Sequence, residues 1–136
     1  MKKANELALA GSPYLYRSNN QHMIILVLPK ESVDVTYLKT LISDFHTNSL
    51  GNEVFEISAL LLGLDQHLLM IKSFENIKKS MSYYELFIQE GSVMEVLNKS
   101  EYKIMSISFE NFQEFYKNKD TQGHYNFFTK NYLTND

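Results

Sequence analysis

Few residues in this chain have the types and spacing that chemistry requires. His22 and His67 each begin a candidate strand and would make a metal-binding pair if they lay at the same end of a sheet. The order of elements derived below makes these two strands antiparallel, which places the two rings at opposite ends. We therefore expect no metal site.

The remaining candidates have simpler structural explanations. Asp65 and His67 lie two residues apart at the end of a hairpin, where an aspartate usually caps its own turn. Asp44 and His46 are two apart on an expected helix and so point in different directions. No serine lies in a Gly-x-Ser-x-Gly elbow, and the five glycines are isolated, so no phosphate loop is present. The sequence predicts neither catalytic residues nor a cofactor.

The same four letters, Ser-Phe-Glu-Asn, occur at 73–76 and at 108–111, each time after a short apolar strand. We interpret both as strand-to-helix junctions, with Ser73 and Ser108 as helix-start residues that accept hydrogen bonds from exposed backbone amides. They set the order strand, helix, strand, strand, helix, strand. This order predicts an α+β, ferredoxin-like βαββαβ sandwich.

Each element has its own signature. The apolar run 23–28, closed by Pro29, is typical of a central strand buried on both faces. A helix begins after Asp34 and ends near 48–51, and a β-hairpin joins strands over 54–62 and 67–74. A second helix runs from Glu75 towards Gly91, with a short helical turn over 93–97 and a last strand over 103–108. The predicted core-facing positions of the two long helices are Val35, Leu38, Ile42 and Phe45, then Ile77, Met81, Tyr84 and Ile88.

An aromatic C-terminal appendage follows, predicted as two short helices separated by residues 120–123. Leu60, Leu62 and half of the central strand must point to a sheet face that the two long helices cannot cover. We expect the appendage to cover this face, with a partner or a homodimer through the same face as the alternative. The covering side chains would be Phe112, Phe115, Tyr125, Phe128 and Tyr132.

Composition bounds the class of protein. The 136 residues suffice for one core, 44% are hydrophobic, and cysteine is absent. A formal charge of −3 argues against a nucleic-acid partner, and no stretch approaches the ~20 apolar residues of a membrane span. We expect residues 1–20 to be a flexible N-terminal linker, in which Tyr14, Leu15 and Tyr16 are apolar enough to dock, and residues 21–136 to be a single α+β domain.

Several short motifs, in order along residues 21–133, resemble one family. They are Ser43-Asp44-Phe45, Lys72-Ser73-Phe74 with Asn76, Tyr83-Tyr84, Phe112, Phe115-Tyr116-Lys117, Lys119-Asp120, Gly123, Tyr125, Phe127-Phe128 and Lys130-Asn131-Tyr132. Together they look like the C-terminal domain of the SprE/PorW family, large lipoproteins of the type IX secretion and gliding motility machinery of Bacteroidota. The chain has neither a lipidated cysteine nor a helical repeat near 34 residues, in contrast to a full-length member, so the resemblance implies an excised C-terminal domain.

The resemblance implies a periplasmic, non-enzymatic adaptor, tethered to the outer membrane in the full-length protein and docking to protein components of the envelope machinery. Tyr116, Lys117, Lys119 and Asp120 are our candidate partner-binding residues, with a solvated face as the alternative explanation. Two rival functions remain open. One is a peptidoglycan-binding module like the SPOR domains, which share this element order, and the other is a small-ligand regulatory domain of the ACT type.

Overall fold

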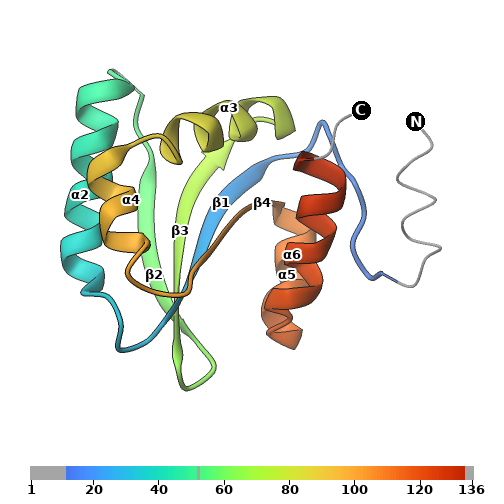
Figure 1. The fold of residues 1–136 in the computed structure, drawn as a ribbon. Coiled ribbons are helices and arrows are strands. Elements are labelled where there is room, and N and C mark those ends of the chain that lie inside the picture. Colours follow the sequence, from blue (N-terminus) through green and yellow to red (C-terminus); the bar gives the residue numbers. More distant parts are fainter. Residues whose placement is uncertain (1–11, 52, 134–136) are drawn as a thin grey trace.

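Four antiparallel strands form one sheet in the order β2-β3-β1-β4. The structure is a computed structural model that describes residues 12–51 and 53–133 (Figure 1). The strands are β1 His22–Pro29, β2 Glu56–Leu62, β3 Gln66–Phe74 and β4 Lys103–Ser108. The helices are α2 Val35–Ser49, α3 Ile77–Phe87, α4 Gly91–Leu97, α5 Phe109–Asn118 and α6 Thr121–Phe128, followed by a π-helical turn, Thr129–Leu133. The predicted α+β class is confirmed, and this arrangement is compatible with a ferredoxin-like fold.

The apolar strand β1 lies in the centre of the sheet, as its composition predicts. It pairs with β3, with Ile24 opposite Ile71, and with β4, with Ile25 opposite Met105. His22 and His67 belong to antiparallel strands and lie at opposite ends of the β1–β3 ladder. The predicted placement of the two rings at opposite ends of the sheet is therefore confirmed.

Helices α2, α3 and α4 cover the first face of the sheet. The stripe of α2 follows the prediction, with Leu38, Ile42 and Phe45 buried. The stripe of α3 differs, because Tyr83 and Phe87 face this core. Of the other expected positions, Tyr84 packs against the clusters on both faces and Met81 against the cluster on the second face. Ile77 is buried, and Ile88 is 36% exposed. Helix α3 thus contacts both hydrophobic clusters of the domain.

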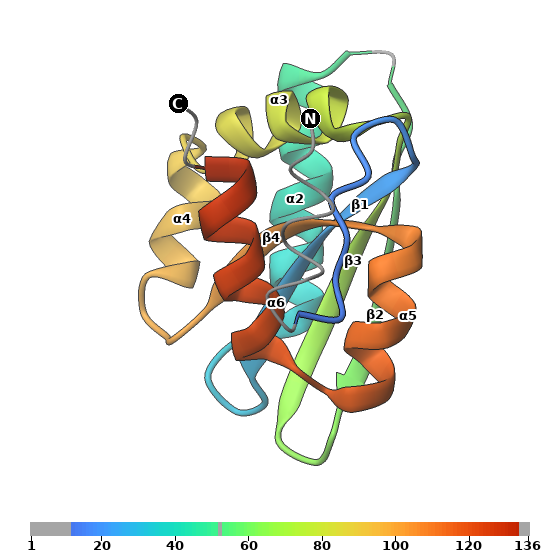
Figure 2. The ribbon, with the colours of Figure 1, turned by 90° about the vertical axis from the view of Figure 1, so that its right-hand side faces the viewer.

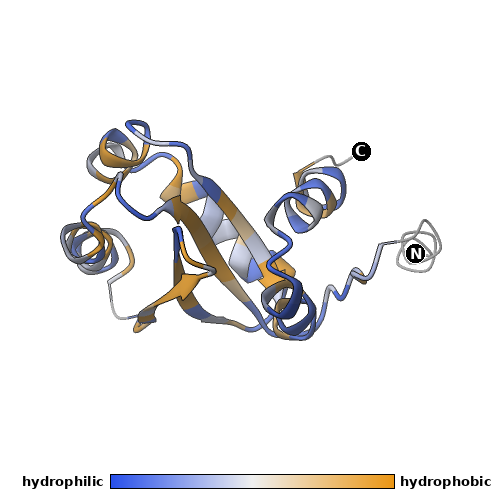
Figure 3. Cartoon of the chain, turned by 90° about the horizontal axis from the view of Figure 1, so that it is seen from below, coloured by the Kyte–Doolittle hydropathy of each residue, from blue (hydrophilic) through white to orange (hydrophobic). Residues whose placement is uncertain are grey.

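The aromatic appendage covers the second face, as predicted. Phe115 and Phe128 are fully buried against Ile25 and Met105 of the sheet. Figure 1 shows α5 and α6 across the sheet from α2 and α4, and Figure 3 shows the largely hydrophobic strands between these two layers. The appendage therefore closes a core of its own rather than extending into solvent.

Part of the expected linker packs on this appendage. Tyr14 is buried, and the backbone of Leu15 exchanges two hydrogen bonds with the side-chain amide of Asn111, at 3.1 and 2.8 Å. In Figure 2 the segment before β1 runs between α5 and α6. Residues 12–20 are thus packed on the domain, while residues 1–11 of the expected linker lie outside the described residues.

The two Ser-Phe-Glu-Asn junctions differ in structure. Ser108 caps α5 as expected, accepting a 3.0 Å hydrogen bond from the backbone amide of Asn111. At the first junction β3 continues through Phe74, and Asn76, not Ser73, caps α3. A further difference is that α6 begins at Thr121, so only the sharp turn at 119–120 separates α5 from α6.

Candidate functional site

The outer edge of β2 is an unpaired, apolar margin of the sheet. Within the described residues, β2 pairs only with β3. Four aliphatic side chains along this edge and its flanks are exposed: Val54 at 92%, Leu60 at 42%, Leu61 at 47% and Leu64 at 90%. An exposed edge of this kind presents free backbone donors and acceptors to another chain.

The pairing register explains why the leucines of β2 differ in exposure. Leu60 lies opposite Leu68 and shares the second face, whereas Leu61 lies opposite His67 on the first face. Leu62 is buried in the cluster beneath the appendage, but Leu60 lies at the margin of that cover. Strand β2 is thus apolar on both faces and incompletely covered on each.

Two predicted partner-binding residues lie beside the end of this edge. The hydroxyl of Tyr116 donates a long hydrogen bond of 3.5 Å to the backbone carbonyl of Leu61. Lys119, at a left-handed φ of 52°, ends α5 with its aliphatic stem beside Gly63 of the hairpin turn. Lys117 is exposed on the last turn of α5. Tyr116, Lys119 and the exposed leucines of the hairpin therefore border the same end of the sheet.

The fourth predicted residue, Asp120, has internal partners. Its carboxylate accepts hydrogen bonds from the hydroxyl of Tyr14 at 3.0 Å and from the backbone amide of Gly123 at 3.1 Å. A side chain held in this way caps α6 and anchors the N-terminal segment. Among the four candidates, Asp120 is the one with a clear role in the fold.

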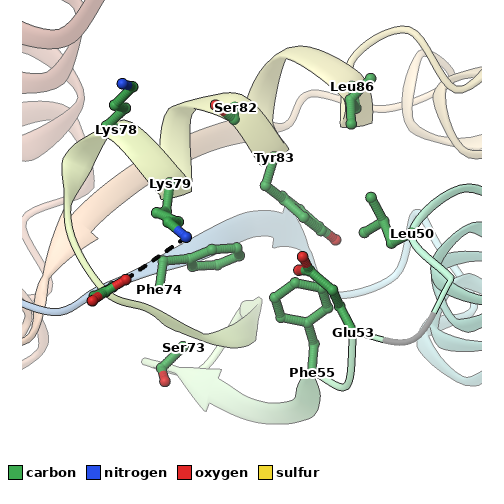
Figure 4. Close-up of a pocket in the computed structure, with 11 residues that line it drawn as sticks. Leu50, Glu53, Phe55, Ser73, Phe74, Lys78, Lys79, Ser82, Tyr83 and Leu86 are labelled. Carbon is green, nitrogen blue, oxygen red and sulfur yellow. Dashed lines mark ion pairs between the residues drawn. The ribbon is translucent and has the colours of Figure 1, made fainter.

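A groove of about 490 Å³ opens at the other end of β2, where α2, β3 and α3 meet. Figure 4 shows Phe55, Phe74 and Tyr83 around it. Its lining consists of Leu50, Glu53, Phe55, Ser73, Phe74, Glu75, Lys78, Lys79, Ser82, Tyr83 and Leu86. The sequence predicts Phe55 on a hairpin, but no local signal marks it as part of a groove.

A buried polar contact adjoins the groove through Tyr83. The hydroxyl of Tyr83 and the Nε2 atom of His46 are 2.6 Å apart and joined by a hydrogen bond between α3 and α2. Burial lowers the pKa of His46 and raises the pKa of Tyr83. Both groups are therefore neutral at pH 7 and add no charge to the groove.

The charges lie at the groove rim. Lys79 pairs with Glu75 at 3.7 Å, and Lys78 points away from the cavity in Figure 4. The carboxylate of Glu53 points over the ring of Phe55 in the same view. The structure records no ion pair for Glu53 within the described residues. Glu53 and Lys78 are thus the rim charges without an ion pair within the described residues, and of these two the Glu53 carboxylate is the one that points towards the groove.

Other buried titratable groups lie under the appendage. His22 and Tyr132 share a 2.7 Å hydrogen bond, and His124 lies among aromatic rings with its Nδ1 atom 3.3 Å from the sulfur of Met105. In residues 12–51 and 53–133 no three histidines or carboxylates gather as a metal site. Over the same ranges, none of the helices has the length and apolar character needed to cross a bilayer.

Comparison with known proteins adds no relative. No family model matches the chain, and neither curated proteins nor solved structures give a significant match. The functional assignment therefore depends on the geometry above and on the residue resemblance.

Proposed function

We propose that this chain is a protein-interaction domain of ferredoxin-like βαββαβ topology, a non-catalytic adaptor that binds an extended segment of a partner protein along the edge of β2. The observation that carries the proposal is the unpaired β2 edge with Leu60 and Leu61 exposed on its two faces. Addition of a strand to such an edge satisfies the free backbone groups and buries the leucines at once.

Strand β2 has few of the features that block strand addition. Its sequence, Glu-Ile-Ser-Ala-Leu-Leu-Leu, contains one charged residue, Glu56, and neither proline nor lysine. Edge strands that avoid pairing usually carry such residues or are bulged or covered. A seven-residue edge without these blocking features supports the proposal that β2 binds a partner.

We place this adaptor in the type IX secretion machinery of Bacteroidota, as a periplasmic domain whose full-length protein is tethered to the outer membrane. The support is the ordered set of short motifs shared with the SprE/PorW family. In this setting the extended segment would belong to another protein component of the envelope machinery. The buried contacts between the appendage and the sheet support a rigid domain that docks as one unit.

The peptidoglycan alternative has less structural support. A glycan that binds an open sheet needs a free face with polar or aromatic groups, whereas α2–α4 and α5–α6 cover the central strands here. The same cover limits homodimerisation through the second face to the margin at Leu60. An ACT-like ligand site at a subunit interface gains no specific support.

A crosslinking experiment in the native envelope tests the proposal. A photo-reactive residue replaces Leu61 in the full-length protein, and a matched one replaces Tyr37, which is 53% exposed on α2. We expect crosslinks from position 61, and not from position 37, to one protein of the secretion machinery. The substitution Leu61→Lys should abolish that contact and leave thermal unfolding of the domain unchanged.

Three results would contradict the proposal. Equal crosslinking at both positions would mean that the partner does not bind specifically at the β2 edge. Retention on purified peptidoglycan that survives Leu61→Lys would support the glycan-binding alternative. A stable dimer in light scattering that Leu61→Lys dissociates would mean that the edge binds a second copy of this chain instead of a partner.

A further inference from the structure

We infer that the groove lined by Phe55, Phe74 and Tyr83 binds an arginine side chain, presented by a peptide or by a segment of another protein. This site is separate from the strand-addition edge, and its ligand is defined by charge and ring geometry. The inference goes beyond the proposed function and does not require it.

The carboxylate that points into the groove favours a cationic ligand. Glu53 has no ion pair within the described residues, and its carboxylate points into the groove over Phe55 (Figure 4). Of the two lysines in the lining, Lys79 is paired with Glu75 at 3.7 Å, and Lys78, which has no ion pair within the described residues, points away from the groove. A guanidinium entering here gains a counter-ion without breaking an existing pair.

The aromatic wall offers the second half of the site. The ring centroid of Phe55 lies 5.1 Å from that of Phe74 and 5.3 Å from that of Tyr83. Phe55 is half-buried and so keeps part of its ring in contact with solvent. A planar guanidinium stacks on such a ring while its N–H groups bind a carboxylate, a combination that suits arginine better than lysine.

The remaining surroundings of the groove are compatible with this ligand. His46, which is hydrogen-bonded to Tyr83, is neutral at pH 7 because burial lowers its pKa, so it does not repel a cation. Leu50 and Leu86 supply apolar surface on one side of the groove (Figure 4). A volume of about 490 Å³ exceeds one side chain, so an apolar neighbour of the arginine can be accommodated as well.

The test is an NMR titration of the chain with N-acetyl-arginine amide, and with the leucine and glutamate analogues as matched probes. We expect the arginine probe to shift the amides of Glu53, Phe55 and Lys79, and to bind more weakly as salt concentration rises. Glu53→Gln should weaken its binding ~10-fold, because a charge-assisted hydrogen bond is lost. Phe55→Leu should weaken it by a smaller factor.

The matched control is Glu56→Gln, which removes a neighbouring carboxylate on the other face of the sheet and should leave arginine binding unchanged. Leucine binding as tight as arginine binding would overturn the inference, as would glutamate binding or no shift with any probe. Leu61→Lys should leave arginine binding intact. A failed titration therefore leaves the crosslinking test of the β2 edge unaffected, and the reverse also holds.

Discussion

The hydroxyl of Tyr14 donates a 3.0 Å hydrogen bond to the carboxylate of Asp120, 106 residues further along the chain. The other oxygen of that carboxylate accepts from the backbone amide of Gly123 and so caps α6. Burial is the largest cause of a raised pKa for Tyr14, and the Asp120 carboxylate raises it further. The hydroxyl therefore remains a donor at neutral pH. One aspartate thus fixes both the N-terminal segment and the start of the last helix.

Tyr14→Phe should lower the free energy of unfolding by ~1–2 kcal/mol. The substitution keeps the buried ring but removes a hydrogen bond to a charged group. Urea denaturation measures the loss. Tyr37→Phe, which removes an exposed hydroxyl on α2, is the control and should change stability by less than ~0.5 kcal/mol. Equal values for the two variants would mean that the N-terminal segment is not held by Asp120.

Two helical glycines should respond to alanine with opposite signs. A Cβ on Gly123 would collide with the carboxylate of Asp120, whereas a Cβ on Gly91 would enter open space. We expect Gly123→Ala to cost ~1–3 kcal/mol, because Asp120 must abandon its hydrogen bonds. Gly91→Ala should stabilise the domain by up to ~1 kcal/mol through helix propensity. The measurement is the change in thermal unfolding temperature of each variant. A Gly123→Ala variant that is more stable than the parent chain would contradict the capping geometry.

Phe128→Ala should cost on the order of 3 kcal/mol. The ring is fully buried on the second face and contacts Tyr84 and Tyr132, with ring centroids 5.4 and 5.3 Å away. Equilibrium unfolding in urea measures the cost. A loss below ~0.5 kcal/mol would show that the appendage is loosely attached and available to partners.

The order of elements could be predicted because each depends on local patterns. The apolar run of β1 and the alternating hairpin both specify burial within a few residues. The repeated Ser-Phe-Glu-Asn letters show the limit of such patterns. Ser108 ends its strand and caps α5. Ser73 remains within β3, because the strand continues to Phe74, whose side chain is buried in the first core. Tertiary packing decides between two outcomes for the same four residues.

The candidate sites were predictable to different degrees. The sequence indicates Tyr116 and Lys119 as surface residues of the appendage, but their position beside Leu61 depends on how α5 crosses the sheet. The groove could not be predicted, because its walls come from separate elements. Glu53 and Phe55 meet Tyr83 only once α2 and α3 are packed on the first face.

Acidification should destabilise the domain through its buried histidines. Burial, with a smaller contribution from His22, lowers the pKa of His124 to about 3, and burial also lowers the pKa of His22 and His46. In the unfolded chain these rings titrate near ~6.5. Below pH ~6.5 the unfolded state therefore binds more protons than the folded state. The free energy of unfolding that is present above pH ~6.5 is lost progressively as the pH falls towards 3. Each fully shifted histidine contributes up to ~1.4 kcal/mol per pH unit.

His124→Phe isolates the share of this effect that belongs to His124. The ring at this position is fully buried, with centroids 4.7 Å from Tyr14 and 5.4 Å from Phe127, so an aromatic replacement preserves most packing. The measurement is urea unfolding at pH 7.5 and pH 5.0, above the range where most carboxylates titrate. We expect the loss of stability between these two values to be ~1–2 kcal/mol smaller in the variant, whatever its stability at pH 7.5. The same loss in both proteins would mean that His124 becomes protonated within the fold, which requires that water reaches the ring beneath α6.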